Sequence, residues 1–282
     1  MASIRILEDH LVNQIAAGEV IERPAAVLKE LVENALDAEA SRIRVSLKSG
    51  GRQQVCVEDN GRGMDPADAL MCLERHGTSK IRDGEDLFSV STLGFRGEAL
   101  PSIAAVSRLE ILTRPEAQEV GTRVRMEGGR LMGPEPAGCV AGTRIDVGQL
   151  FFNVPVRRKS LRTSPTELGP SVEAIVRQAL IHPEVDWSLE HAGRQLLRAP
   201  VVETRAERAA DLLKAQGRAL LPLSFQCGEL EVEALCSPVG VHQSSPRGAL
   251  YLYVNGRFVR DSLLRQAVRE AYRHLVPKGR SP

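Results

Sequence analysis

The chain has 282 residues, of which 43% are hydrophobic and 26% charged, a composition typical of a folded globular protein and not of a disordered one. Its 37 Lys and Arg nearly balance its 36 Asp and Glu, so overall charge gives no reason to expect a polyanion partner, and any nucleic-acid surface has to be a local patch. The five cysteines form no C-x-x-C pair, which argues against a structural zinc site or a disulfide framework, and no apolar run predicts a signal peptide or a membrane helix, so we expect a cytoplasmic protein.

Helical and strand periods alternate along the first 200 residues and predict a mixed α/β architecture. In chain order the predicted elements are a helix over 25–38 that follows Pro24, a hairpin of strands 42–48 and 55–59, a helix that begins at Asp65 and ends at Gly77, strands over 120–127 and 142–147, a helix over 166–181, and a hairpin of strands 187–190 and 195–198. Residues 76–97 contain four glycines and little periodicity, so we expect a long functional loop there.

A domain boundary is predicted near Ala199 and Pro200, which gives one domain over 1–200 and a smaller one over 201–282. In the second domain the predicted elements are a helix over 206–216, strands over 220–226, 229–237 and 249–255, and a helix over 261–275. The residues after Leu275 have no pattern typical of a packed end, so we expect this domain to be incomplete at its C-terminus.

The helix predicted over 25–38 has one apolar and one acidic face. The apolar face is formed by Val27, Leu28, Leu31, Val32, Ala35 and Leu36, and the opposite stripe by Glu30, Glu33, Asn34 and Asp37. Such a stripe is usually a solvated face, but a cation opposite it would offset the repulsion between the carboxylates. An amide oxygen beside carboxylates suits Mg²⁺, a hard ion that takes one or two protein ligands together with phosphates.

The strand predicted to end at Asp59 leads into the segment Asn60-Gly61-Arg62-Gly63-Met64. A carboxylate at a strand end, followed by two glycines, can hydrogen-bond a flat ligand while the backbone comes close to it. An ordinary Asn-Gly turn accounts for the same residues, and for this segment alone it is the simpler explanation.

The segment Gly94-Phe95-Arg96-Gly97-Glu98-Ala99-Leu100 opens a predicted helix. Free amides at a helix N-terminus, together with glycines, make an anion site, to which the upstream Thr78, Ser79 and Lys80 could add hydroxyl and ammonium donors. The alternative is a capped helix that follows a flexible loop. A Walker-type phosphate loop is excluded, because the pattern Gly-x-x-x-x-Gly-Lys-Ser/Thr does not occur.

Two basic groups stand out. The first consists of Arg157, Arg158 and Lys159, and the second of Arg257, Arg260, Arg265 and Arg269. Basic groups of this kind are usually solvated faces, and binding of a nucleic-acid phosphate backbone is the functional alternative.

Seven stretches closely resemble, in order, those of the MutL family of DNA mismatch repair proteins, which belongs to the GHKL ATPases. They are NQIAAGEVIERPAAVLKELVENALDA, VEDNGRGM, RHGTSKI, LGFRGEAL, GTRIDV, LFFNVPVRRKSL and YLYVNGRFVRD, and the resemblance extends over nearly the whole chain. The stretches IAAGEVIERP, GFRGEAL and VNGRFVRD are much more specific to the MutL family than to its GHKL relatives, which disfavours a histidine kinase or a topoisomerase subunit.

The resemblance implies an α/β fold (an α+β sandwich), with a GHKL or Bergerat-type ATPase domain followed by a smaller transducer domain of ribosomal-protein-like topology. It implies that Glu30 is the general base for the attacking water and that Asn34 holds the Mg²⁺ of ATP. Asp59 would accept a hydrogen bond from the adenine amino group, with Gly63 and Thr143 beside the base. The other residues expected to bind ATP are Asp37, Met64, Thr78, Ser79, Lys80, Gly94, Phe95, Arg96, Gly97, Glu98, Ala99 and Leu100.

The resemblance further implies an ATP-driven switch. Slow hydrolysis of ATP would control a lid over residues 76–97, formation of an N-terminal homodimer and clamping of DNA by the basic groups. Expected partners are DNA, a second copy of the chain, the mismatch-recognition protein MutS and a downstream repair endonuclease or helicase, in the bacterial cytoplasm near the nucleoid and away from membranes.

One departure from the family concerns a lysine late in the transducer domain that reaches the γ-phosphate, because we identify no equivalent within the 282 residues. The sequence therefore predicts nucleotide binding and leaves turnover by this chain open. The alternative function is a DNA-binding and partner-recruiting module with negligible ATP hydrolysis.

Overall fold

The computed structural model describes residues 17, 21–77, 94, 97–239 and 250–277. The chain divides into two compact units, one formed by Met1–Ile175 with Val185–Pro200 and the other by Val176–Glu184 with Val201–Pro282. Within the described ranges, no helix is both long and apolar enough to cross a membrane.

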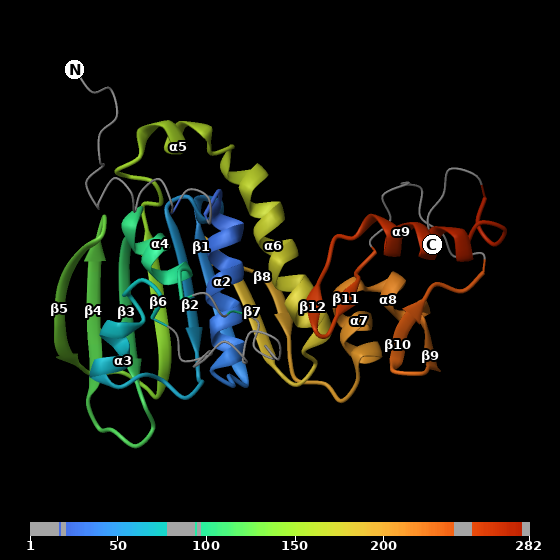
Figure 1. Cartoon of the computed structure of the whole chain (residues 1–282), viewed down its shortest axis with the longest axis horizontal. Coiled ribbons are helices and arrows are strands. Elements are labelled where there is room, and N and C mark those ends of the chain that lie inside the picture. Colours follow the sequence, from blue (N-terminus) through green and yellow to red (C-terminus); the bar gives the residue numbers. More distant parts are fainter. Residues whose placement is uncertain (1–16, 18–20, 78–93, 95–96, 240–249, 278–282) are drawn as a thin grey trace. The chain divides into compact units, whose positions relative to one another are not determined.

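The first unit is built on an eight-stranded sheet with the strand order β5-β4-β3-β6-β2-β1-β7-β8 (Figure 1). The strands are β1 (Arg42–Lys48), β2 (Gln54–Asp59), β3 (Arg108–Arg114), β4 (Gly121–Glu127), β5 (Arg130–Ala137), β6 (Gly142–Gly148), β7 (Asp186–His191) and β8 (Arg194–Ala199). Neighbouring strands run antiparallel except β1 and β7, which pair in parallel. Both predicted hairpins of this unit are confirmed, while β3 and β5 are strands that the sequence patterns did not predict.

The helices of the first unit are α2 (Pro24–Asp37), α3 (Pro66–Met71), α4 (Ala99–Ala105), α5 (Pro155–Ser160) and the first part of α6 (Ser164–Ile181), which continues into the second unit. Helices α2 and α4 lie over one face of the sheet (Figure 1), and α2 packs on β2. Pro24 occupies the first turn of α2, as predicted, where its missing N–H costs no hydrogen bond. The predicted apolar face of α2 forms the centre of the core, with Val27, Leu28 and Leu31 all buried.

Helix α3 begins as predicted but ends early. The Asp65 carboxylate caps it by accepting from the backbone N–H groups of Ala67 at 2.8 Å and Asp68 at 2.9 Å. The prediction that this helix extends to Gly77 is wrong, because it ends at Met71. Beyond that point the chain tightens into three-residue turns, the first of which joins the N–H of Leu73 to the carbonyl of Leu70.

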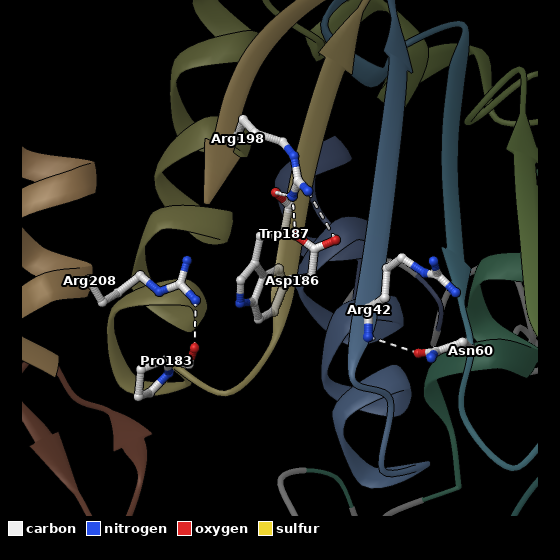
Figure 2. A network of polar contacts seen from close by, with 7 residues as sticks. All are labelled: Arg42, Asn60, Pro183, Asp186, Trp187, Arg198 and Arg208. Atoms are coloured by element: carbon white, nitrogen blue, oxygen red, sulfur yellow. Dashed lines mark hydrogen bonds and ion pairs between the residues drawn. The ribbon is translucent and has the colours of Figure 1, made fainter. Parts of the chain in front are cut away.

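The β7–β8 hairpin is fixed at its open end by one guanidinium. Figure 2 shows Arg198 between the carboxylate of Asp186 and the carbonyl oxygen of Trp187, to which its Nη1 donates at 3.2 Å. The side chain of Trp187 is fully buried beneath the ion pair of Arg198 and Asp186. The edge strand β8 is thereby joined to β7 by side-chain contacts in addition to the backbone ladder.

The second unit contains α7 (Arg205–Leu213), α8 (Ala215–Ala219), the hairpin β9 (Leu221–Cys227) and β10 (Leu230–Cys236), the short pair β11 (Tyr253–Val254) and β12 (Arg257–Phe258), and α9 (Ser262–Ala271). The single helix predicted over 206–216 is wrong, because the chain breaks at Lys214, whose φ is +57°. After the break, Gly217 packs so closely on α7 that a Cβ there would lie 1.9 Å from the carbonyl oxygen of Ala209. The buried Arg208 of α7 donates to the carbonyl of Pro183 at 2.7 Å (Figure 2).

Candidate active site

Four buried polar side chains form one row across strands β2, β6, β3 and β4. Asp59 lies opposite Thr143, Thr143 opposite Thr113, and Thr113 opposite Thr122. Directly paired residues of antiparallel strands point to the same face, so the row lies on the face that carries the apolar core residue Val57 two positions before Asp59. The buried face of the sheet therefore changes from apolar to polar side chains at this row.

Hydrogen bonds connect this row to the loop that follows β2. The hydroxyl of Thr113 lies 2.9 Å from the hydroxyl of Thr143 and 3.2 Å from the carbonyl oxygen of Gly142. The backbone N–H of Met64 donates to the same Thr113 oxygen at 2.9 Å. Thr113 thus joins the predicted site residues Met64 and Thr143, although sequence reasoning did not select it. The available signal was the alternation of β3, whose inward positions run Leu, Ile and then Thr.

Asp59 is 9% exposed, and its carboxylate accepts hydrogen bonds from the backbone N–H groups of Gly61, at 2.9 Å, and of Thr143. Burial raises the pKa of Asp59 to about 6, and the two backbone donors offset only part of that rise. An acidic group with so few donors around it is suited to accept a hydrogen bond from a polar ligand.

The loop from Asn60 to Met64 is held against both of its neighbours. The Oδ1 atom of Asn60 accepts from the N–H of Arg42 at 2.7 Å (Figure 2). A Cβ on Gly61 would lie 2.6 Å from the carbonyl oxygen of Ala38 at the end of α2, and one on Gly63, whose φ is +69°, only 2.3 Å from a backbone oxygen of β3. The close backbone packing of this segment on α2 and β3 accounts for both glycines without a ligand.

On helix α2, the candidate base Glu30 is paired with Lys29, which sequence reasoning missed. The Nζ atom of Lys29 lies 2.9 Å from Oε1 of Glu30 and 2.8 Å from Oε2 of Glu33. The alternative of a solvated acidic face does not hold for Glu33, because that residue is only 7% exposed. The cation expected opposite the carboxylates is therefore supplied, in part, by the chain itself.

Burial raises the pKa of Glu33, and this effect outweighs the opposing effect of the Lys29 ammonium. Partial burial acts to lower the pKa of Lys29, but the carboxylates of Glu30 and Glu33 outweigh it and the pKa is raised. The ammonium is therefore kept charged beside the acidic stripe at neutral pH.

The half-buried amide of Asn34 remains the metal ligand predicted on α2. Among the residues that the structure describes, no three His, Cys, Asp or Glu side chains are gathered closely enough to hold a metal ion. A lone amide oxygen fits Mg²⁺ when phosphate oxygens and water complete the octahedron. The residues present therefore fit a metal ion that binds together with a nucleotide.

Three further residues predicted to bind ATP, Gly94, Gly97 and Glu98, lie near α2 and the start of α4. The backbone N–H of Gly94 donates to Oδ2 of Asp37 at 3.2 Å, which places this glycine at the C-terminal end of α2. Gly97, with a φ of +61°, packs on Gly77, where a Cβ would lie 2.6 Å from the carbonyl oxygen. Glu98 lies 3.8 Å from the ring of His76. Both ends of the predicted loop thus meet at one place beside α2.

Ala99 and Leu100 form the first turn of α4, which no side chain of the described residues caps. The backbone N–H groups of such a turn have no partner within the helix and suit an anion. The other predicted phosphate-binding residues, Thr78, Ser79, Lys80, Phe95 and Arg96, lie outside the described residues.

The two basic groups belong to different compact units. In the first group Arg158 and Lys159 are exposed, whereas Arg157 is half-buried and donates from Nη1 to the carbonyl oxygen of Ile21 at 3.2 Å. In the second group Arg260, Arg265 and Arg269 are exposed and Arg257 is half-buried.

Two sequence profiles match the chain. Residues 22–127 match the family described as "Histidine kinase-, DNA gyrase B-, and HSP90-like ATPase", and residues 211–282 match "DNA mismatch repair protein, C-terminal domain". The first match spans α2, the loop from Asn60 to Met64 and α4, which carry most of the candidate site.

Known proteins of the same family align with the whole chain. DNA mismatch repair protein MutL of Symbiobacterium thermophilum is 48% identical over 283 residues, and that of Anaeromyxobacter dehalogenans is 49% identical over 284 residues. Each alignment covers 100% of this chain but only 44% and 46% of those relatives, so the chain spans less than half their length.

Solved structures agree with the sequence comparison. The Aquifex aeolicus MutL ATPase domain complexed with ADP is 30% identical, with a TM-score of 0.69 and coverage of 89% of this chain and 88% of that one. The N-terminal domain of a DNA repair protein is 26% identical, with a TM-score of 0.79 and coverage of 94% and 82%. The first unit has the fold of a GHKL ATPase domain, and the chain belongs to the MutL family of DNA mismatch repair proteins.

Proposed function

We propose that this chain is the N-terminal ATPase region of a mismatch repair protein, which binds ATP with Mg²⁺ and hydrolyses it slowly. The observation that carries the proposal is the buried carboxylate of Asp59 at the end of β2, set among the hydroxyls of Thr113 and Thr143. The ADP held by the related Aquifex aeolicus domain supports it.

Asp59 selects the base in this proposal. Its carboxylate can only accept when it is ionised, so it pairs with the exocyclic amino group of adenine and disfavours guanine, which presents an oxygen at that position. The loop glycines allow the backbone after Asp59 to pack directly on α2 and β3 beside the carboxylate.

The phosphates would lie between α2 and the first turn of α4, where its backbone N–H groups favour anions. Asn34 would hold the Mg²⁺, which neutralises phosphate charge when bound. Glu30 acts as the general base that orients and deprotonates the attacking water, with one carboxylate oxygen steadied by Lys29 at 2.9 Å. Such positioning and charge neutralisation are what phosphoryl transfer needs most.

At the level of the whole repair protein, we propose that ATP closes the loop of residues 76–97 over the phosphates and promotes an N-terminal homodimer. The exposed Arg158, Lys159, Arg260, Arg265 and Arg269 would then contact DNA phosphates. MutS and a repair endonuclease or helicase would read the nucleotide state, in the bacterial cytoplasm near the nucleoid. A DNA-binding module without hydrolysis is not favoured, because the related ATPase domain binds ADP.

Calorimetric titration of ADP into wild type, Asp59→Asn and Glu58→Gln tests the nucleotide site. Loss of a hydrogen bond to a charged group should weaken ADP binding by about tenfold to a hundredfold in Asp59→Asn. Glu58→Gln is the matched control, because Glu58 is the preceding residue of β2 and faces the other side of the sheet, 3.2 Å from Arg44. Equal affinities in all three proteins would refute the assignment of Asp59.

Single-turnover hydrolysis tests the role of Glu30. A general base contributes roughly 10²–10⁴ in rate, so Glu30→Ala should slow cleavage by that factor while ADP affinity stays unchanged. If Glu30→Ala hydrolyses ATP within twofold of wild type, Glu30 is not the base.

A further inference from the structure

The β6–α5 loop (residues 149–154) holds the end of α4 that points away from the phosphate site. The backbone N–H of Phe151 donates to the carbonyl of Val106 at 2.7 Å, and Nδ2 of Asn153 donates to the carbonyl of Ala105 at 2.9 Å. These carbonyls belong to the C-terminal turn of α4, which would otherwise leave them without helical partners. The loop therefore fixes α4 at the end opposite to its first turn.

Arg157, just after this loop, holds the start of α2 in the same way. Its Nη1 donates to the carbonyl of Ile21 at 3.2 Å, and its guanidinium carbon lies 5.9 Å from the ring centre of Phe151. Ile21 and Ala17 are fully buried and are joined by a 2.8 Å backbone hydrogen bond, so Arg157 is attached to a buried residue just before α2.

The backbone of the β6–α5 loop is strained. Gln149 has a φ of +51° and Phe151 a φ of +62°, a region that bulky residues rarely adopt. Strain of this kind persists where the surroundings over-determine the conformation, and it concentrates at functional sites. Here the surroundings are the fully buried ring of Phe151 and the two hydrogen bonds to α4.

We propose that Arg157 is a positioning residue for the nucleotide site and not a DNA contact. Through the β6–α5 loop it joins the N-terminal end of α2, the helix whose later turns carry Glu30 and Asn34, to the C-terminal end of α4, the helix whose first turn would bind the phosphates. This inference rests on the proposed function, and it separates Arg157 from the exposed Arg158 and Lys159, which remain available to DNA phosphates.

The first test needs no nucleotide. Amide hydrogen exchange is measured in wild type, Arg157→Met and the matched control Arg158→Met. Arg157→Met should speed exchange of the Ile21 amide by at least about tenfold while that of Trp187, in β7, stays unchanged, because only the contact of Arg157 with Ile21 is lost. Equal exchange at Ile21 in all three proteins would overturn the proposal. An equal increase at the Ile21 and Trp187 amides of Arg157→Met would overturn it as well, because it indicates general destabilisation. If Arg157→Met does not fold, Arg157→Lys, which keeps the charge without the planar group, should show a smaller increase at Ile21 alone.

The second test separates nucleotide from DNA. ADP affinity, measured well below the unfolding temperature, should fall about threefold to tenfold in Arg157→Met, be partly recovered in Arg157→Lys and stay unchanged in Arg158→Met. The log–log salt dependence of duplex binding should lose about 0.9 in slope in Arg158→Met and nothing in Arg157→Met. The reverse pattern would make Arg157 a DNA contact and refute the inference. Failure of wild type to bind ADP would instead refute the proposed function and leave the exchange experiment to decide the role of Arg157.

Discussion

At the scale of single residues, Asp59 works against the stability of the fold. Burial raises its pKa to about 6, so at neutral pH the folded chain keeps a carboxylate charge that is more poorly solvated than in the unfolded chain. A residue that is poorly solvated in the free protein gains most when a ligand donates a hydrogen bond to it. This trade of stability for recognition is typical of binding sites.

The raised pKa of Asp59 predicts how stability depends on pH. Between its usual value of 3.8 and about 6, the folded chain binds more protons at this group than the unfolded chain, so the free energy of unfolding falls as pH rises through that window. One pH unit corresponds to about 1.4 kcal/mol, so the loss is roughly 3 kcal/mol and is complete above pH 6. Urea unfolding of wild type and Asp59→Asn, measured from pH 4 to 8, isolates this loss of unfolding free energy. The unfolding free energy of the variant should exceed that of wild type by an amount that grows up to pH 6 and then stays level. An advantage independent of pH would contradict this account.

Some of the site residues could be predicted from the sequence and others could not. Asp59 ends an alternating strand and is followed by two glycines, so its position was accessible from pattern and resemblance. Lys29 looked like an ordinary exposed lysine, because its role depends on Glu33 turning toward the core. Thr113 could not be selected, because its contacts with Met64 and Thr143 exist only after three distant segments have come together.

At the scale of elements, Gly142 controls how β6 begins beside the site. Its φ is +116°, and a Cβ there would lie 2.1 Å from the carbonyl oxygen of Asp59. Gly142→Ala should therefore destabilise the chain by more than about 2 kcal/mol, through both strain and overlap. Gly138→Ala is the matched control, since nothing lies within 4 Å of its Cβ position, and it should change stability by less than about 0.5 kcal/mol. Urea unfolding of the two variants and wild type measures these changes. Equal stabilities of Gly142→Ala and Gly138→Ala would mean that β6 does not approach β2 so closely.

Elements with a clear period were predicted best. The β1–β2 hairpin and α2 follow from alternation and from an apolar helical face, and both are confirmed. Strand β5 was missed because it contains Pro134 and Pro136, which a strand accommodates at a sheet edge, and edge position is a property of the whole sheet. The break at Lys214 was missed because the close approach of α8 to α7 leaves no local signal except one glycine.

At the scale of the whole molecule, one helix belongs to both compact units. Helix α6 runs from Ser164 to Ile181, and its residues from Val176 onward are grouped with the second unit. Helical periodicity continues across that point, so a sequence pattern places a boundary at the next loop, near residue 200. The assignment of 1–200 to the ATPase domain and 201–282 to the transducer domain stays a prediction.

Ligand-induced stabilisation should be visible in the first unit. The single tryptophan, Trp187, is buried there, so its fluorescence reports unfolding of that unit. ADP at a hundred times its dissociation constant should add about 2.7 kcal/mol to the unfolding free energy and raise the fluorescence transition by several degrees. At the same ADP concentration, Asp59→Asn should show a clearly smaller rise. A wild-type transition that ADP does not move, at a concentration shown by calorimetry to saturate, would exclude binding to the folded first unit.

The ammonium of Lys29 also bears on the order in which small ions and nucleotide arrive. With a positive charge already lying between Glu30 and Glu33, helix α2 offers a divalent ion one neutral amide, that of Asn34, in place of a pair of carboxylates. Such an ion draws most of its affinity from the polyphosphate chain that accompanies it. We therefore expect free magnesium to bind the chain only weakly, and a magnesium–nucleotide complex to bind it as a single unit.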